Sequence, residues 1–234
     1  MLEELISSGF KELGLECGEE TLRRYRLYAE LLSEKNKVMN LTAIEGEDEI
    51  SRLHFLDSAA LLGVADMSGR RVIDVGTGAG FPGLALKIAR EDISLVLLDS
   101  LDKRVGFLRE LCGELGFGDV ECVHARAEEA DAAYRGAFDF AVSRAVARLS
   151  PLCELCLPFV KVGGAFIAMK GPDHAQELCE AERAISLLGG RTEKDVDYRI
   201  PGTDVVHSAI LIRKIADTPK KYPRRWAQIK KQPL

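Results

Sequence analysis

The stretch Arg71-Val-Ile-Asp-Val-Gly-Thr-Gly-Ala-Gly-Phe-Pro-Gly83 decides the fold. It opens with a short β-branched, apolar run, which is typical of a buried strand. Three alternating glycines come next, and Pro82 leads into a helix-like segment that ends near Arg90. A strand, a glycine turn and a helix in this order bring bare backbone close to a nucleotide-like ligand in α/β proteins. The stretch therefore predicts a ligand crevice beyond the end of a strand.

The same turn contains a match to G-x-G-x-x-G at residues 78–83, the pattern of NAD-binding proteins. The match starts two residues after the strand ends at Gly76, which is late for that motif. Asp74 stands at the strand end, where we expect its carboxylate to face the crevice and repel a pyrophosphate. A cationic ligand such as S-adenosylmethionine, which has an ammonium, a sulfonium and no phosphate, would be attracted there. A glycine turn without any ligand is the third interpretation.

Length and composition are those of an ordinary globular protein. The chain has 234 residues, of which 47% are hydrophobic and 29% charged, enough for one α/β domain with an extension. No apolar run approaches the ~18 residues of a membrane span, and the acidic start is unlike a signal peptide, so we expect a cytoplasmic protein.

The six cysteines lie in apparent helices and strands, which favours reduced thiols. Cys153 and Cys156 form a lone C-x-x-C in an apolar stretch, which favours core packing over a metal site.

Charge is distributed unevenly along the chain. The net charge of −5 is the sum of +6 in residues 218–234 and −11 in the rest. This basic tail also contains Tyr222 and Trp226, and such a tail can pair with phosphates and stack on bases. The alternatives are a solvated terminus or a tail that packs on the domain, with Trp226 covering an apolar patch.

The chain changes character near Arg70. Before it, helical spacing predicts helices near residues 2–13, 22–38 and 48–62, with His54 and Asp57 on one helix face. After it, strands and helices alternate, which indicates a mostly parallel sheet covered on both faces. Strands are predicted at 71–75, 94–98, 120–124, 138–142, 164–169, 192–199 and 205–215. Helices are predicted at 83–89 and 103–115, near 128–132 and 149–159, and at 173–188.

Only Pro201-Gly202-Thr203 joins the last two strands, so these should form an antiparallel hairpin at the end of a seven-stranded sheet. We expect a helical N-terminal extension (1–66), a Rossmann-like domain (67–216) and a basic C-terminal tail (217–234).

Polar residues follow several predicted strands, at the edge of the sheet where ligands bind in open α/β folds. The second strand ends in Asp99, a carboxylate suited to accept hydrogen bonds from both hydroxyls of a ribose. The third ends at His124, which we interpret as a surface residue. No Ser-His-Asp, H-E-x-x-H or Walker pattern occurs, which excludes common hydrolases and kinases.

Taken together, these motifs make the chain resemble the RsmG (GidB) family over nearly its whole length. The motifs are Asn40-Leu-Thr42, His54-Phe-Leu-Asp-Ser58, Asp74 to Gly83, Leu98-Asp-Ser100, Lys103-Arg104, Arg126-Ala-Glu-Glu129, Ser143-Arg-Ala145, Lys170-Gly171 and Thr218-Pro-Lys-Lys-Tyr-Pro-Arg224. Only the ending Trp226-Ala-Gln-Ile229 departs from the Gly/Pro-containing ending usual in that family. The resemblance implies a class I S-adenosylmethionine-dependent methyltransferase that acts on N7 of a guanine in 16S ribosomal RNA of the small ribosomal subunit.

The resemblance also implies roles for individual residues. It implies a cofactor held by Gly76, Phe81, Asp99, Ala127, Glu128 and Arg144, and substrate-side roles for Asn40, His54, Arg126 and Lys170. It implies no metal, and we expect a monomer. Guanine N7 has a free lone pair near neutral pH, so the transfer needs alignment of the reacting atoms but no general base. Lys170 or Arg144 is the residue that we expect at guanine O6 or a phosphate.

Two other functions remain open at this point. Lys103 and Arg104 follow Asp99 and could hold the 2′-phosphate of NADP in an oxidoreductase. Alternatively, the fold could bind RNA without catalysing any reaction.

Overall fold

A seven-stranded sheet with the order β3-β2-β1-β4-β5-β7-β6 forms the centre of the molecule. The computed structural model describes residues 2–144, 147–171 and 174–234. Strands β1 to β5 pair in parallel, whereas β7 is antiparallel to both β5 and β6. The strands are β1 (Arg71–Val75), β2 (Ser94–Asp99), β3 (Glu121–His124), β4 (Phe138–Arg144), β5 (Val160–Lys170), β6 (Gly190–Arg199) and β7 (Val206–Lys214).

Each predicted strand is present, and the predicted α/β sheet with a final antiparallel strand is confirmed. The antiparallel strand β7 lies inside the sheet and not at its edge, because β6 pairs along its outer side. The chain leaves β5 through a helix, forms the outer strand β6, and then returns through the short turn to pair with β5.

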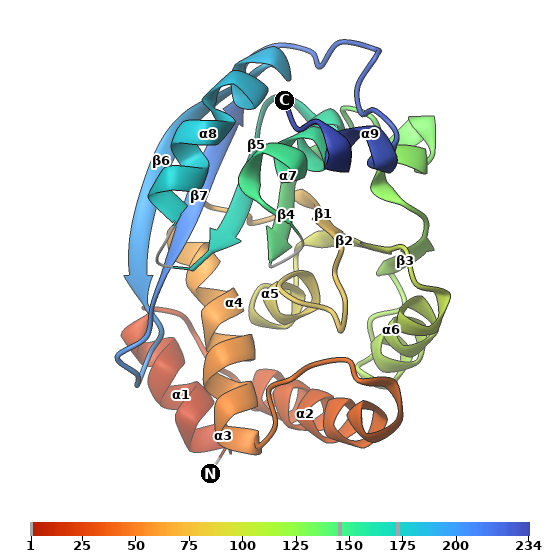
Figure 1. Ribbon diagram of the computed structural model, residues 1–234. Helices are drawn as coiled ribbons and strands as arrows, with labels where there is room; N and C mark the ends of the chain where they lie inside the picture. The colour runs from red at the N-terminus through yellow and green to blue at the C-terminus, as the bar shows by residue number, and fades with distance from the viewer. Residues whose placement is uncertain (1, 145–146, 172–173) are drawn as a thin grey trace.

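Helices cover both faces of the sheet (Figure 1). On one face, the strands contact α5 (Gly83–Ala89) and α6 (Asp102–Glu114), and the same apolar cluster includes α1 (Leu2–Glu12) and α2 (Glu19–Met39). The other face packs against α7 (Leu149–Cys156), α8 (His174–Leu187) and α9 (Trp226–Lys231). The side chains of β1 alternate between these two faces. Val72 belongs to the first apolar cluster, whereas Ile73 and Val75 belong to the second.

The segment expected as one helix over residues 48–62 is divided into four short pieces. These are α3 (Glu47–Ile50), the π-helical η1 (Ser51–Leu56), α4 (Asp57–Ala59) and the 3-10 turn η2 (Ala60–Gly63). Single π turns are frequent at functional sites, and this one contains His54.

One further helix prediction is wrong, and one begins at a residue outside the described part of the chain. The helix expected near 128–132 is replaced by the 3-10 turns η3 (Ala127–Glu129) and η4 (Ala132–Tyr134), and η5 (Leu157–Phe159) follows α7. The helix expected over 173–188 is described from His174, because residue 173 lies outside the described residues.

The N-terminal helices share the core of the sheet. Tyr25 and Tyr28 of α2 are fully buried, and burial raises the pKa of both phenols. Their hydroxyls donate to the carbonyl oxygens of Ala85, at 2.8 Å, and Ala79, at 2.6 Å. Because Ala79 belongs to the glycine turn, this hydrogen bond attaches α2 directly to that turn.

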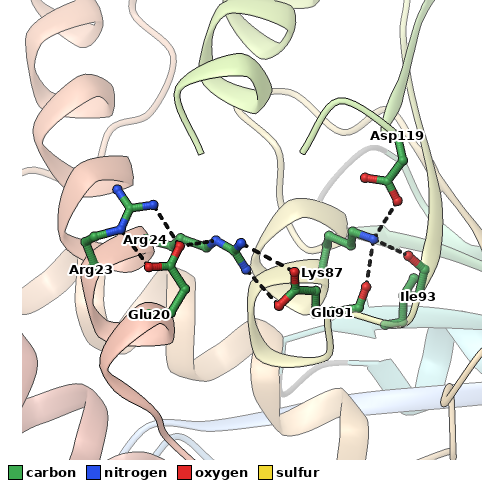
Figure 2. A network of polar contacts seen from close by, with 7 residues as sticks. All are labelled: Glu20, Arg23, Arg24, Lys87, Glu91, Ile93 and Asp119. Carbon is green, nitrogen blue, oxygen red and sulfur yellow. Dashed lines mark hydrogen bonds and ion pairs between the residues drawn. The ribbon is translucent and has the colours of Figure 1, made fainter. Parts of the chain in front are cut away.

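Ion pairs add to this contact at the surface. Figure 2 shows Arg24 of α2 between Glu20 and Glu91, with an N–O distance of 3.0 Å to each. Lys87 of α5 is buried, and its ammonium donates to two backbone carbonyl oxygens and to Asp119, at 2.9 Å (Figure 2). The pair of Arg24 and Glu91 links α2 to the end of α5, and Lys87 links α5 to the segment before β3.

The C-terminal tail packs on the opposite face of the sheet, beside α7 (Figure 1). Glu154 of α7 is fully buried, and its carboxylate accepts hydrogen bonds from the backbone N–H and the guanidinium of Arg224 at 2.6–2.8 Å. Tyr222 and Ile229 are buried in the apolar cluster on this face. Arg135 donates to the carbonyl oxygens of Thr218 and Tyr222. The interpretation that the tail packs on the domain is therefore confirmed.

The outer side of the tail remains cationic. Arg224 is paired with Glu154, whereas the remaining basic side chains are exposed, namely Lys220, Lys221, Arg225, Lys230 and Lys231. Contact of this side with RNA stays a prediction. The division of the chain into an extension, a domain and a tail after residues 66 and 216 also stays a prediction.

The C-x-x-C pair belongs to the core, as predicted. Cys153 and Cys156 are fully buried, and burial raises the pKa of both thiols. Among the described residues, no group of His, Cys, Asp and Glu is arranged to hold a metal ion. Over the same residues, none of the helices combines the length and hydropathy of a membrane span.

Candidate active-site crevice

Asp74 does not face the crevice, which corrects the expectation from the sequence. Alternation places it with Val72 on the face of β1 that α5 covers. Its carboxylate is fully buried, and Oδ2 accepts hydrogen bonds from Thr77 Oγ1, at 2.7 Å, and from the N–H of Gly83, at 2.8 Å. Burial raises the pKa of Asp74 to about 7. Asp74 therefore holds the glycine turn against α5 and does not meet a ligand directly.

This position of Asp74 also argues against a dinucleotide. A pyrophosphate in an NAD site binds the free N–H groups at the start of the helix that follows the glycine turn. Here the N–H of Gly83 is occupied by Asp74. A Cβ on Gly83 would lie 2.7 Å from the Cβ of Asp74, so glycine is needed there for packing of the turn. The match to G-x-G-x-x-G thus has a structural cause.

Three cavities lie in a row along the carboxyl ends of the strands. The first, of about 240 Å³, is lined by Val75, Gly76, Leu98, Asp99, Ser100, Ala125, Arg126, Ala127, Glu128, Leu155 and Trp226. The second, of about 370 Å³, is lined by Leu41, Thr42, His54, Gly76 to Ala79, Phe81, Asp99, Ser100, Arg104 and Arg144. The third, of about 530 Å³, is lined by Ile44, Leu53, His54, Asp57, Arg144, Met169, Lys170, Gly171, Val205 and His207.

Shared residues join these cavities into one crevice. Gly76 and Asp99 line both the first and the second cavity, and His54 and Arg144 line both the second and the third. An elongated ligand in the first two cavities would therefore have one end at the wall between the second and third. A second molecule in the third cavity would lie on the other side of His54 and Arg144.

Asp99 stands at the junction of the first two cavities. Its carboxylate is 3% exposed and accepts hydrogen bonds from the N–H groups of Gly78 and Leu101, both at 2.9 Å. Each oxygen keeps a further lone pair for a ligand hydroxyl. The backbone of Gly78 has a φ of +62°, and a Cβ there would meet no atom within 4 Å. The turn therefore requires glycine at this position for its backbone angle.

A buried polar network forms the wall between the second and third cavities. Asp57 is fully buried, and its carboxylate accepts hydrogen bonds from Arg144 at 3.1 Å, Tyr198 at 2.8 Å and His207 at 2.9 Å. The hydrogen bond with Asp57 raises the pKa of His207. Asp57 comes from the N-terminal segment, whereas Tyr198 and His207 come from β6 and β7. The network thus joins the N-terminal helices to the last hairpin.

His54 is a neutral member of the same wall. Burial and the charge of Arg144 lower the pKa of His54 to about 3. The guanidinium of Arg144 donates to Nδ1 of His54 at 2.8 Å, so the proton of the neutral ring resides on Nε2, which donates to Thr42 Oγ1 at 2.8 Å. Phe81 stacks on His54, with ring centroids 4.3 Å apart. Both ring nitrogens are occupied, so His54 is a positioning group and not an available base.

The crevice brings together most of the predicted site residues. The predicted cofactor residues all line the first or second cavity, namely Gly76, Phe81, Asp99, Ala127, Glu128 and Arg144. Arg126, for which we expected a substrate-side role, lines the first cavity beside Ala127 and Glu128. Asn40 is exposed at the end of α2 and lines none of the three cavities. The roles of these residues stay predictions.

Lys170 lines the third cavity, but its charge is already paired. The ammonium donates to Glu177 at 2.8 Å and to the carbonyl oxygen of Ala147 at 2.8 Å. One N–H remains for a ligand. Arg144 faces the same cavity with its charge balanced by Asp57.

Sequence reasoning missed several residues of the crevice. Thr42 was part of a motif but received no role, and His207 and Tyr198 gave no local signal because their partner Asp57 is more than 140 residues away in sequence. The pairing of His54 and Asp57 on one helix face was visible, and both contact Arg144. Trp226 was expected to meet RNA or to cover an apolar patch, and it lines the first cavity.

The fold is that of a Rossmann-like methyltransferase. A solved S-adenosylmethionine-dependent methyltransferase from Aquifex aeolicus matches with a TM-score of 0.52 at 20% identity, covering 68% of this chain and 89% of that one. A geranyl diphosphate methyltransferase matches with a TM-score of 0.57 at 13% identity, covering 74% and 93%. At these identities the likeness concerns the fold alone.

The sequence comparisons identify the family. The model of the GidB family, rRNA small subunit methyltransferase G, matches residues 21–199. The ribosomal RNA small subunit methyltransferase G of Alkaliphilus oremlandii is 45% identical over 100% of this chain and 99% of its own length. The same protein of Clostridium botulinum is 43% identical, covering 98% of each chain. The chain belongs to the rRNA small subunit methyltransferase G family, and its expected membership is confirmed.

Proposed function

We propose that this protein methylates N7 of a guanine in 16S ribosomal RNA of the small ribosomal subunit, with S-adenosylmethionine as methyl donor. Membership in the rRNA small subunit methyltransferase G family supports the substrate, and the row of three cavities supports the reaction. The row is the observation on which the proposal rests most directly, because it offers a ligand site that ends where a second site begins.

The residues of the first two cavities fit S-adenosylmethionine. Asp99 offers one lone pair on each carboxylate oxygen for the ribose hydroxyls, and the backbone of Gly76 lines the path between the two cavities. Ala127 and Glu128 border the apolar end of the first cavity. Arg144 stands at the far end of the second, where it suits the methionine carboxylate. The cofactor supplies an electrophilic methyl group.

The third cavity is the proposed guanine site. It is bordered by His54, Arg144 and Lys170, all with N–H groups or rings that suit a purine. His54 is neutral because its pKa is about 3, so it places no proton or cation at the attacking N7. A nucleophile without a proton to lose needs no base, which agrees with the occupied nitrogens of His54. Arg144 and Lys170 each have an N–H left for O6 or a phosphate.

Access to N7 limits the form of the RNA. The major groove of regular A-form RNA is too deep and narrow for side chains, so the target guanine must lie in a loop or distorted junction. The exposed tail cations would add salt-dependent affinity for phosphates.

We place the protein in the cytoplasm, where small subunits are assembled. We infer a monomer, since the large exposed apolar side chains of the described residues are few and scattered, including Val38, Leu101 and Val162.

Transfer of a labelled methyl group tests the proposal. Small subunits that lack the modification are incubated with the protein and labelled S-adenosylmethionine, and the 16S RNA is then cleaved chemically at 7-methylguanosine. We expect label at one guanine N7. Asp99→Ala should weaken S-adenosylmethionine binding by about 1.5–3 kcal/mol, the range for a hydrogen bond to a charged group, while the RNA is still bound.

The outcome also separates the alternatives. Calorimetric binding of NADPH without binding of S-adenosylmethionine would support the oxidoreductase. Binding of S-adenosylmethionine and subunits without methyl transfer would support a non-catalytic RNA-binding protein. Either result would overturn the proposed activity.

A further inference from the structure

Trp226 occupies a fixed position at the edge of the crevice. It is the first residue of α9 and is half-buried against the apolar cluster beside α7. Two residues earlier, Arg224 is held by three hydrogen bonds to the buried Glu154. Three residues later, Ile229 is fully buried. The indole therefore has anchored chain on both sides and does not depend on a partner molecule for its position.

The surface that Trp226 presents belongs to the inside of the crevice. The first cavity is lined by the indole together with Leu98, Leu155 and Asp99. Asp99 and Gly76 also line the second cavity, whereas Trp226 does not. The indole is therefore at the end of the crevice that lies away from Arg144, beyond the carboxylate proposed for the ribose.

We propose that Trp226 forms a wall of the adenine subsite, so that the C-terminal tail completes the cofactor site. The inference rests on the proposed binding of S-adenosylmethionine. With the ribose at Asp99 and the methionine end toward Arg144, the adenine lies in the first cavity. An indole is the side chain with the largest aromatic face, and it gains both apolar burial and ring contact when it packs on a purine. Stacking on an RNA base is disfavoured, because the same ring would have to leave this cavity.

This placement gives the tail two sides with different tasks. The inner side offers Trp226 to the cofactor, and the outer side offers cations such as Arg225 and Lys230 to the solvent. A tail that is not docked leaves the first cavity without one wall. Cofactor affinity should therefore depend on docking of residues 218–234, even though all predicted cofactor residues lie between 76 and 144.

Trp226 is the single tryptophan of the chain, so its fluorescence reports on this cavity alone. We expect the emission to change on titration with S-adenosylhomocysteine and with adenosine, and to stay constant with methionine. In calorimetry, Trp226→Ala should bind S-adenosylhomocysteine about 5- to 150-fold more weakly, from a stacking contribution of about 1–3 kcal/mol. Trp226→Phe should recover most of the affinity. Gln228→Ala, in the same helix but exposed, is the matched control and should bind as the wild type does.

Three results would overturn the inference. These are constant emission at saturating S-adenosylhomocysteine, equal responses to adenosine and methionine, or a folded Trp226→Ala variant with wild-type affinity. In each case calorimetric binding to the wild type leaves the proposed function intact. Absence of any binding of S-adenosylmethionine to the wild type would instead overturn the proposed function. If Trp226→Ala does not fold, the adenosine and methionine titrations of the wild type decide.

Discussion

The two ends of the chain reach the same crevice from opposite faces of the sheet. The N-terminal segment contributes Thr42 and His54 to the second cavity, and the C-terminal tail contributes Trp226 to the first. Both lie outside the Rossmann-like strands and helices. The crevice is therefore a property of the whole chain and not of the central sheet alone.

The two ends are attached in different ways. The N-terminal helices enter the main apolar cluster through large aromatic side chains, including Tyr25, Tyr28 and Phe55. The tail depends on fewer groups, chiefly Tyr222, Ile229 and the pair between Arg224 and Glu154. The difference indicates that the N-terminal segment is part of the core, whereas the tail is a separately docked element held at a few points.

Removal of residues 218–234 should have the largest effect on stability. It exposes the surface under Tyr222 and Ile229, each worth about 1.5–3 kcal/mol, and leaves the buried Glu154 without its partner, which costs about 3–5 kcal/mol. We expect a loss of more than about 5 kcal/mol in a urea unfolding experiment. The full-length control is Lys220→Ala with Lys221→Ala, which removes charge but no packing. An unchanged melting temperature after truncation would show that the tail is not docked.

Asp57→Ala should be the most damaging single substitution at the N-terminal side of the crevice. It leaves the charge of Arg144 buried without its carboxylate, for which we expect a loss of about 3 kcal/mol of unfolding free energy. The matched control is Asp204→Ala, since Asp204 forms an exposed pair with Arg199 and should cost less than about 1 kcal/mol. Equal losses of unfolding free energy for the two variants would contradict a stabilising role of the network around Asp57.

Lowering the pH should lower the free energy of unfolding through protonation of His54 in the N-terminal segment. Its pKa is lowered from 6.5 to about 3 in the folded protein, so its contribution to stability is present above pH 6.5 and is lost as the pH falls toward 3. The slope is at most about 1.4 kcal/mol per pH unit. The raised pKa of Asp74 acts in the opposite direction, because between pH 3.8 and about 7 the folded state holds a proton that the unfolded state has lost.

Comparison with His54→Gln isolates the histidine contribution, because the background from Asp74 is common to both proteins. Urea unfolding at pH 7.5, 6.5 and 5.5 should show the difference between wild type and variant shrinking below pH 6.5. A difference that stays constant over this range would contradict a neutral, buried His54.

The smallest expected effect concerns the outer side of the tail. Lys230→Ala with Lys231→Ala should change stability by less than about 0.5 kcal/mol, because both side chains are exposed. In binding to small subunits, each lost phosphate contact should flatten the slope of log affinity against log salt by about 0.7–0.9. An unchanged slope would show that these cations serve solubility and do not contact RNA phosphates.

Much of the fold followed from the sequence because its signals are local. The β-branched run before the glycine turn identified β1, and helix α5 was predicted with its observed bounds of Gly83–Ala89. Apolar periodicity also found the N-terminal helices. It did not reveal the π turn at Ser51–Leu56, because a widened turn changes the backbone hydrogen bonds without changing the residues.

The site was predicted less completely, and the reasons differ by residue. The direction of Asp74 was within reach of the sequence, since in a strand it shares a face with the buried Val72 two residues earlier. The buried Glu154 also had a signal, because an acid in an apolar helix requires a partner, but the sequence does not say that the partner is Arg224. The position of Trp226 depends on contacts between residues far apart in sequence, and these follow only from the assembled fold.

Hydrogen–deuterium exchange with and without S-adenosylhomocysteine tests most directly whether both ends of the chain form the cofactor crevice. We predict that the ligand slows exchange in residues 76–81 and 99–101, and equally in the two remote segments at 41–44 and 224–230. Slower exchange confined to residues 76–128, with both terminal segments unchanged, would contradict it.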